Sequence, residues 1–264
     1  MNALAVAPVL ADVLAKKHSP PPSFDVDTST SFDTGGGFPS AMPVLIVLSA
    51  LALLGLIFYL SYTMKERRRA GFQQMATQLR LTYSEQDPLG ILGYPFTLLH
   101  RGDGQGIENV LYGPWQEVDV VAFDYWYYDE STDSNGATSR SYHRFDCALV
   151  PIDADCPRLT IARESLFTAI ADASSFHDLE FESEDFNRDF NVRCEVPKFA
   201  NDLIDARMMA WLMSTGYSHA FEAVGNRVLV AGPRIDPVEL TTLLGVARGF
   251  VQHVPAVVSS LYPG

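Results

Sequence analysis

Cysteine is scarce in this sequence. Its three cysteines, Cys147, Cys156 and Cys194, are widely spaced, and no Cys-x-x-Cys pair occurs. An odd number of separated cysteines is typical of free thiols in a reducing compartment, where the side chains serve as small buried apolar groups. The cysteine content therefore agrees with a cytoplasmic location for the part of the chain that carries them.

Motifs for catalysis and for cofactors are also missing. The sequence has no His-x-x-x-His or His-Glu-x-x-His pair for zinc, no Gly-x-Ser-x-Gly elbow and no Ser-x-x-Lys motif. Gly102, Gly104 and Gly106 alternate, but neither a Lys-Ser/Thr pair nor a long helix follows them, so they predict a hairpin turn and not a phosphate loop. No cofactor is expected. A hydrolytic triad stays open, because its members need not be close in sequence.

Basic residues are few in the C-terminal three quarters of the chain. Ala70–Gly264 holds 13 basic and 27 acidic residues, a net charge of −14. A domain this acidic repels nucleic-acid phosphates, so nucleic acid is not an expected partner. The 195 residues of this part are enough for one domain with a proper core, or for two small ones.

What the chain does have is one long uncharged run, Pro43–Met64, of 22 residues. As a helix it would extend about 33 Å, enough to cross a bilayer core of about 30 Å. A buried soluble helix would carry a polar face, and a cleaved signal peptide would have a basic start and a shorter apolar core. We therefore predict a single transmembrane helix, which makes the lipid bilayer the first partner of the chain.

Basic residues follow this run directly. They are Lys65, Arg67, Arg68 and Arg69, whereas the nearest preceding lysine lies more than 20 residues away. Basic residues beside a span remain cytoplasmic, so we expect the N-terminus outside and the C-terminal part inside, at a bacterial inner membrane. The same four side chains are predicted to contact lipid headgroups at the membrane interface.

The sequence divides into five parts. Residues 1–42, rich in Pro, Ser, Thr, Asp and Gly over their second half, predict an extracytoplasmic and mostly disordered tether. The other parts are the transmembrane helix at 43–64, a basic amphipathic connecting helix at 65–81, an acidic cytoplasmic domain at 82–255 and a tail at 256–264.

Alternating apolar residues predict many strands in the acidic domain. The strands are expected at 96–100, 108–112, 118–129, 142–150, 158–163, 178–182, 190–196, 220–224 and 227–231, with turns at Gly113-Pro114, Asn135-Gly136 and Gly225-Asn226. Helices are expected at 164–173, 197–213 and 236–254, the last of which opens with an Asp N-cap followed by Pro and Glu. Hairpins of strands with helices between and after them indicate an α+β fold, in which an antiparallel sheet carries flanking helices.

Several short segments follow the span in a characteristic order. They are Leu81-Thr82-Tyr83, Asn109-Val110-Leu111-Tyr112-Gly113, Phe123-Asp124-Tyr125, Leu159-Thr160-Ile161 with Glu164, and Leu179-Glu180-Phe181 before Phe186-Asn187-Arg188. Over about residues 65–255 this order resembles a family of bacterial, mostly actinobacterial, membrane-anchored proteins of unknown function. The resemblance implies that the second and third segments are paired strands, and it implies neither an activity nor a catalytic residue.

The aromatic stretch Phe123–Tyr128 is the most unusual part of the domain. In a strand, its odd-numbered residues would share one face and its even-numbered residues the other. One interpretation is a central strand covered on both sides. The other is an aromatic face that binds a protein partner, a peptide or an apolar ligand. The candidate binding residues are Trp115, Asp124, Trp126 and Tyr128.

Acidic residues gather after His177. In a strand, Asp178, Glu180 and Glu182 would share one face. They are interpreted as a charged edge that blocks strand addition, or alternatively as oxygen ligands of a divalent metal cation.

These observations favour a single-pass membrane protein that presents a protein-binding or scaffolding domain to the cytoplasm. Two alternatives are a membrane-tethered hydrolase and a regulator that responds to a divalent cation. The hydrolase requires a pocket in which a His or Cys meets a carboxylate within hydrogen-bond reach. A role other than catalysis is preferred, because no recognisable active-site motif is present.

Overall fold

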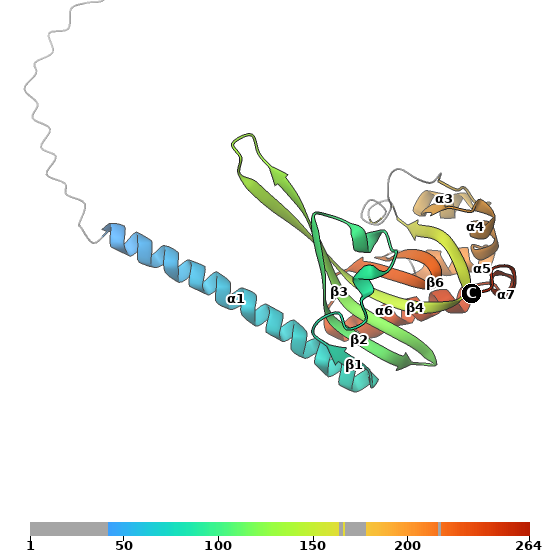
Figure 1. Ribbon diagram of the computed structural model, residues 1–264, viewed down its shortest axis with the longest axis horizontal. Coiled ribbons are helices and arrows are strands. Elements are labelled where there is room, and N and C mark those ends of the chain that lie inside the picture. Colours follow the sequence, from blue (N-terminus) through green and yellow to red (C-terminus); the bar gives the residue numbers. More distant parts are fainter. Residues whose placement is uncertain (1–41, 164–165, 167–177, 216–217) are drawn as a thin grey trace, which may run out of the picture. The chain divides into compact units, whose positions relative to one another are not determined.

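The computed structural model describes residues 42–163, 166, 178–215 and 218–264 (Figure 1). Almost all of the predicted tether at 1–42 and of the predicted helix at 164–173 lies outside these residues. The chain forms two compact units, Met1–Leu56 and Ile57–Gly264. Everything described below, apart from the first part of helix α1, belongs to the second unit.

Helix α1 (Met42–Leu79) runs without a break through the uncharged segment and the connecting segment. Among the described residues it is the one helix long and apolar enough to cross a membrane, and its apolar side chains from Val44 to Leu60 are exposed. The hydroxyls of Ser49 and Thr63 donate to the carbonyls of Ile46 and Leu60, three residues earlier, at 2.8 and 2.9 Å. These two hydroxyl groups are therefore satisfied by the backbone of the helix itself, as is favourable in lipid.

A six-stranded antiparallel sheet forms the centre of the second unit. Its strands are β1 (Thr82–Ser84), β2 (Gly104–Trp115), β3 (Val118–Thr132), β4 (Thr138–Ala162), β5 (Asn191–Cys194) and β6 (Ala220–Pro233). The strands β1 to β4 are neighbours in order, and both β5 and β6 pair with the long strand β4. The predicted α+β class, with one long apolar helix before the sheet, is confirmed.

The helices that follow are short, apart from α6. They are α3 (Glu184–Asp189), α4 (Pro197–Leu203), α5 (Ala206–Thr215), the 3₁₀ turn η4 (Pro237–Glu239), α6 (Leu240–His253) and α7 (Ala256–Leu261). The side chain of Asp236 accepts a hydrogen bond from the backbone of Val238 at 3.0 Å, which confirms the predicted helix start. Helix α6 buries Leu243, Ala247 and Phe250 against the sheet, at the spacing of one helix face.

The sheet has an apolar core on each face. Alternation along β3 sends Val120 and Ala122 to the face covered by α1 and α6. It sends Phe123 and Tyr125 to the opposite face, which is covered by the 3₁₀ turns η1 (Ile91–Gly93) and η2 (Leu98–His100). The face that carries α1 is the one on which the candidate site lies.

The predicted hairpin at 220–231 is wrong, because this segment is the single strand β6. Gly225 does have a positive φ of 57°, but it opposes Cys156 at a register shift between β4 and β6. A glycine with positive φ fits a bulge as well as a turn, and here the strand continues through this position. The predicted turn at Gly113-Pro114 is also displaced, since the β2–β3 turn occurs at Gln116 and Glu117, both with positive φ.

Two predicted strands are absent because side chains bind their backbone groups. In the segment 96–100, which forms η2, the backbone of Thr97 donates to the carboxylate of Glu222 and the carbonyl of Leu98 accepts from Tyr125. In the segment 178–182, Asn187 both accepts from the backbone N–H of Phe181 at 2.8 Å and donates to its carbonyl at 2.7 Å. These bonds replace a strand ladder, and only Asp178 keeps an isolated bridge.

The predicted helix at 197–213 is broken into α4 and α5. Asp205 lies between the two helices, and its carboxylate accepts from the backbone N–H of Met208 at 2.8 Å. This is an N-cap bond, which starts a second helix in place of extending the first.

Candidate functional site

Arg68 lies at the centre of a buried ion cluster beneath α1. Its Nε and Nη2 donate to the two carboxylate oxygens of Asp124 at 2.7 and 2.5 Å, and Nη2 also contacts Asp146 at 2.5 Å. Nη1 donates to the carbonyl of Ile235 at 2.7 Å. We call Arg68, Asp124 and Asp146 the Arg68 cluster. It joins α1 to β3, β4 and the segment after β6.

Further polar groups support this cluster. Asn109, which has a positive φ of 55°, donates to Asp124 at 2.9 Å and accepts from the hydroxyl of Tyr83 at 2.9 Å. The backbone N–H of Ile235 donates to Asp146 at 2.8 Å. Each carboxylate therefore has a partner in addition to Arg68, as buried charges require.

The two carboxylates share one cation, and one of them has a shifted pKa. Burial, followed by the hydrogen bond and charge of Asp124, raises the pKa of Asp146 to about 7. Burial by itself lowers the pKa of Arg68, but the bonds and charges of the two aspartates outweigh it and the pKa rises. Arg68 thus stays charged, while Asp146 exchanges its proton near neutral pH.

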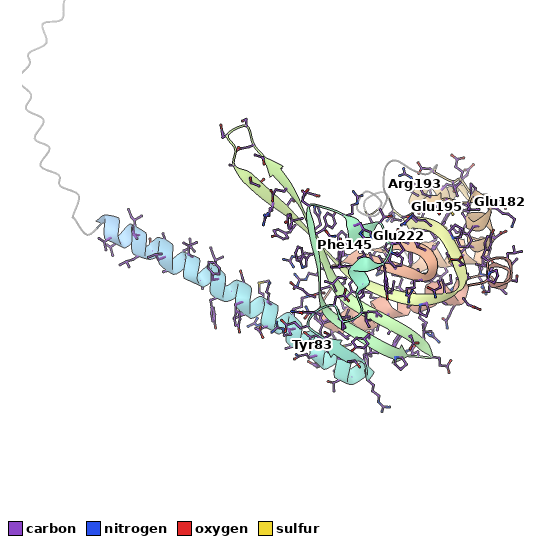
Figure 2. All side chains as sticks on the ribbon, viewed as in Figure 1. Tyr83, Phe145, Glu182, Arg193, Glu195 and Glu222 are labelled. Carbon is purple, nitrogen blue, oxygen red and sulfur yellow. The ribbon has the colours of Figure 1, made fainter. Side chains whose placement is uncertain are left out.

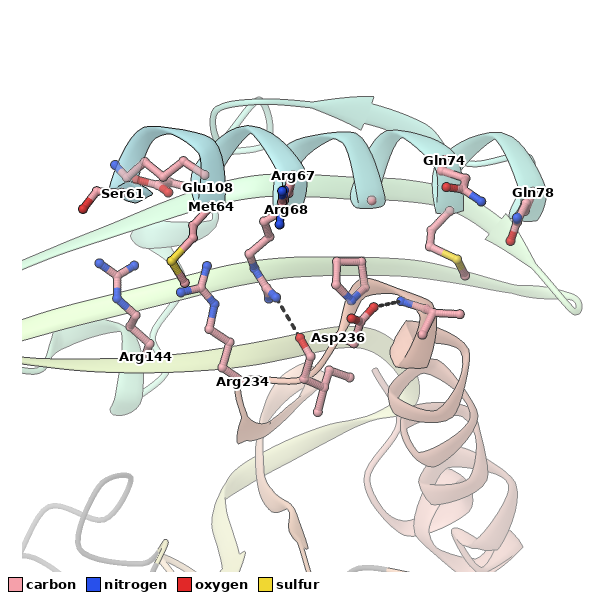
Figure 3. A pocket seen from close by; sticks show the side chains of 16 residues that line it. Ser61, Met64, Arg67, Arg68, Gln74, Gln78, Glu108, Arg144, Arg234 and Asp236 are labelled. Carbon is pink, nitrogen blue, oxygen red and sulfur yellow. Dashed lines mark hydrogen bonds between the residues drawn. The ribbon is translucent and has the colours of Figure 1, made fainter. Parts of the chain in front are cut away.

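A cavity of about 800 Å³ lies beside the Arg68 cluster, between α1 and the sheet (Figure 3). Five of its lining side chains are basic. Besides Arg68, four extend from two directions: Lys65 and Arg67 from α1, and Arg144 of β4 and Arg234, which follows β6, from the sheet. We call these four residues with their cavity the basic pocket. Its acidic lining residues are Glu108 and Asp236, and the carboxylate of Asp236 already caps the turn η4.

The basic pocket holds arginines that form no ion pair with the described residues. Within the described ranges, neither Arg144 nor Arg234 lies within 4.0 Å of a carboxylate. Arg144 lies instead 5.9 Å from the ring centroid of Tyr142. Partial burial, together with the charges of Arg68 and Arg144, lowers the pKa of Arg234. Burial is the largest of these causes, and the charges of Asp124 and Asp146 act in the opposite direction.

An aromatic surface lies on the same face of the sheet, along the β3–β4 hairpin. Trp126 and Tyr128 stack with ring centroids 6.4 Å apart, and Tyr142 of β4 lies 6.0 and 5.4 Å from them. The guanidinium of Arg140 lies 4.7 Å from the ring centroid of Tyr128. We call Trp126, Tyr128 and Tyr142 the aromatic surface. Trp126 and Tyr128 are half-buried and Tyr142 is exposed.

Glycines of β2 make room for these rings. A Cβ atom on Gly104 would come within 2.5 Å of the Tyr128 ring, and one on Gly106 within 2.5 Å of the Trp126 ring. Gly104 and Gly106, predicted to form a turn, instead lie at the start of strand β2, where two aromatic rings pack directly on them. Gly102, with φ of 74°, remains in the turn before it.

The predicted binding residues are thus divided among different places. Trp126 and Tyr128 lie together, and Asp124 lies on the same face but belongs to the Arg68 cluster. Trp115 lies at the other end of β2, opposite Val118, and packs on the helix-covered core. Sequence reasoning missed Tyr142, although its alternation with Arg144 and Asp146 could have placed it on this face.

The predicted interface residues are divided as well. Arg68 is inside the Arg68 cluster, and Arg69 contacts both Glu66 and Glu85. Lys65 and Arg67 line the basic pocket.

The predicted metal ligands lie on the surface. Asp178 pairs with Arg193 at 2.7 Å, and Glu180 and Glu182 are exposed (Figure 2). Among the residues that the structure describes, no three His, Cys, Asp or Glu side chains are grouped to hold a metal ion. His177 lies outside the described residues.

The remaining groups with catalytic potential are buried or remote from the pocket. Burial raises the pKa of all three cysteine thiols, so none of them is a ready thiolate. Glu222, inside the domain, accepts from Thr97 and from Arg158 at 2.5 Å (Figure 2). His143 meets Asp129 at 3.1 Å, but both side chains are exposed on the hairpin. The basic pocket itself is lined by neither His nor Cys.

Comparison with known proteins assigns no family. No protein-family model matches the chain, and no curated protein matches it. Among solved structures, the chain is similar to the crystal structure of the mycobacterial trehalose monomycolate transport factor A, TtfA, at 15% sequence identity and a TM-score of 0.49. The similarity covers 72% of this chain and 95% of that one. We therefore infer function from the geometry of the described residues alone.

Proposed function

We propose that this protein is a single-pass membrane-anchored scaffold whose β3–β4 hairpin docks a second protein. The observation that carries the proposal is the aromatic surface at the base of a hairpin that extends beyond the rest of the sheet. Pairing of β2 with β3 starts at Gly104 and Tyr128, and pairing of β4 with β6 ends at Phe145 and Pro233. The hairpin beyond these positions has only its own two strands (Figure 1).

A two-stranded ribbon of this kind is marginal in water by itself. Its exposed and half-buried rings offer a large contact area at a small cost in side-chain entropy. Arg140 and Arg144 flank the rings, so a partner segment with apolar and acidic side chains fits this surface best. The open strand edges of the ribbon would also accept backbone hydrogen bonds from an extended partner.

Site-specific photo-crosslinking in intact membranes tests this proposal. A photoreactive aromatic residue replaces Tyr142, which is 51% exposed, in the full chain. We expect a discrete crosslink to one protein that disappears when Trp126→Ala and Tyr128→Ala are added. The same probe at Leu261, also 51% exposed but on α7, serves as the control. Identical crosslinks from both positions, or a crosslink that survives the double substitution, would contradict docking at the aromatic surface.

The proposal includes an orientation. The four basic residues after the span and the three free cysteines support a cytoplasmic domain and an outside N-terminus at a bacterial inner membrane. A reporter that is active only in the cytoplasm, fused after Gly264, is expected to be active. If only a reporter restricted to the outside is active, the orientation is reversed and the partner must be sought on that side.

A further inference from the structure

We propose that the basic pocket binds the phosphate headgroup of one anionic membrane lipid. The domain around it is strongly acidic, with 27 acidic and 13 basic residues in Ala70–Gly264. The pocket has the opposite balance, since it is lined by four basic side chains besides Arg68 and by two acidic ones. Such a local reversal of charge concentrates anions, not cations, at this position.

Two arginines near the pocket already have carboxylate partners, and this distinguishes them from the arginines that are available to a ligand. Arg68 contacts two aspartates, and Arg69 contacts Glu66 and Glu85. Within the described part of the chain, Arg144 and Arg234 contact no carboxylate, although Arg234 is partly buried. In Figure 3 both side chains extend from the sheet toward α1, so their guanidinium groups face the cavity. Two planar donor groups that face one cavity suit the oxygens of a phosphate.

The position of the pocket along α1 favours a lipid over a soluble phosphate. Ser61 and Met64, from the last turn of the uncharged run, line the same cavity as Lys65 and Arg67. If the run spans the bilayer, these residues mark the boundary at which lipid phosphates lie. The inference therefore rests on the membrane span and does not require docking at the hairpin, although Arg144 belongs to both sites.

Part of the pocket wall is apolar, which suits the glycerol and acyl part of a lipid. Met64, Pro237 and Val238 contribute to it, and Val238 is 65% exposed. Gly71 lets α1 approach this wall, because a Cβ atom at that position would lie 2.8 Å from Cγ of Pro237. An exposed apolar side chain beside unneutralised arginines is a combination that an amphiphile satisfies and free phosphate does not.

Native mass spectrometry of the full chain tests the proposal. The protein is released from nanodiscs that contain either phosphatidylglycerol or phosphatidylcholine with the same acyl chains, and retained lipids are counted. The test variant carries Arg144→Gln and Arg234→Gln. The control variant carries Arg188→Gln and Lys198→Gln, which remove the same charge from side chains that are 69% and 68% exposed elsewhere.

We expect the wild type and the control to retain one phosphatidylglycerol, and the test variant to bind it on the order of 20-fold more weakly. Each basic residue near an anionic membrane surface contributes about fivefold, and two are removed. Equal retention of phosphatidylglycerol and phosphatidylcholine, or equal retention by test and control variants, would overturn the proposal. Displacement of the lipid by millimolar glycerol phosphate would assign the pocket to a soluble phosphate ester and would overturn the lipid assignment. A Gly71→Val variant, which narrows the pocket without a change in charge, is expected to lose the same lipid.

Discussion

Arg67 and Arg68 are neighbours in one basic block, yet they belong to two regions with opposite electrostatic character. Arg68 enters a buried cluster in which every hydrogen-bonding direction meets an aspartate or a carbonyl. Arg67 lines a pocket whose other arginines, Arg144 and Arg234, meet no carboxylate among the described residues. One region uses its cation to hold α1 on the sheet, and the other keeps its cations available.

The difference teaches that burial and partners, not charge itself, separate a structural arginine from a binding arginine. A fully paired cation contributes to stability and offers nothing to a ligand. A cation held near others without a counter-ion adds little to stability, but it gains most when an anion arrives. Substitutions in the two regions should therefore produce opposite patterns of folding and binding defects.

The largest expected effect is that of Arg68→Met. The substitution leaves Asp124 and Asp146 buried without their cation, so the free energy of unfolding should fall by about 3–5 kcal/mol. Urea unfolding of the full chain in detergent micelles measures this. Fluorescence is a suitable signal, because the three tryptophans, Trp115, Trp126 and Trp211, all lie in Ile57–Gly264.

Arg67→Met is the matched control for this prediction. Arg67 is exposed and lines the basic pocket, so its substitution should change the free energy of unfolding by no more than about 0.5 kcal/mol. If both variants unfold at the same urea concentration, the Arg68 cluster does not hold α1 on the sheet.

The second effect is a dependence of stability on pH. The pKa of Asp146 is about 7 in the fold against an ordinary value of 3.8, so the folded state binds an extra proton between these values. Stability from this group is therefore highest at acidic pH and is lost as the pH rises through 7. We expect a loss of about 2 kcal/mol from about pH 5 to about pH 8.

Asp146→Asn isolates this contribution. Burial also raises the pKa of Glu222, which gives the wild type a second slope of the same sign. In the variant, the free energy of unfolding should still depend on pH through Glu222 but no longer through Asp146. A plot of this free energy against pH should therefore be flatter than that of the wild type. If the free energy of unfolding depends on pH equally in the two proteins, the titrating group is not Asp146.

Much of the fold, but little of the site, was predictable from the sequence. Alternation predicted β3, and the Asp-Pro-Val-Glu signal predicted the start of α6, because both are local features. The errors at Thr97 and Phe181 arose because distant side chains, Glu222 and Asn187, bind the backbone there. The turn predicted at Gly225 was wrong because a glycine with positive φ also occurs in a β-bulge.

The site escaped prediction for a related reason. The segment after the span contains four basic residues, and nothing in the neighbouring sequence distinguishes Arg68 from Arg67. Their roles differ because Asp124 and Asp146 come from strands that lie 56 and 78 residues further along the chain. The basic pocket likewise depends on Arg144 and Arg234, which are distant from the basic block in the sequence.

The third prediction compares two glycines. Gly106→Ala would bring a Cβ atom within 2.5 Å of the Trp126 ring, and this overpacking should cost about 1 kcal/mol, since the partly exposed ring can tilt away. Gly245→Ala in α6 meets nothing within 4 Å and should instead stabilise by about 0.5–1 kcal/mol. Thermal unfolding checks both. Equal signs for the two variants would show that Trp126 does not rest on Gly106.

The smallest expected effect on stability concerns Arg140, which pairs with Glu130 at 2.9 Å as Arg68 pairs with Asp124. Water surrounds this pair, because the two side chains are 51% and 37% exposed, so the ion pair gains little over the separate hydrated charges. Arg140→Gln should therefore shift the unfolding temperature by less than about 2 °C.

The same substitution should nevertheless weaken the crosslink from position 142, because Arg140 covers the ring of Tyr128 and so forms part of the surface that the partner contacts. Substitution of Arg68 should thus reduce stability through the loss of an internal contact, whereas substitution of Arg140 should reduce binding and leave stability almost unchanged. A large loss of stability in Arg140→Gln, with the crosslink unchanged, would reverse these roles. The hairpin would then be a structural element, and the docking site would have to lie on another face of the domain.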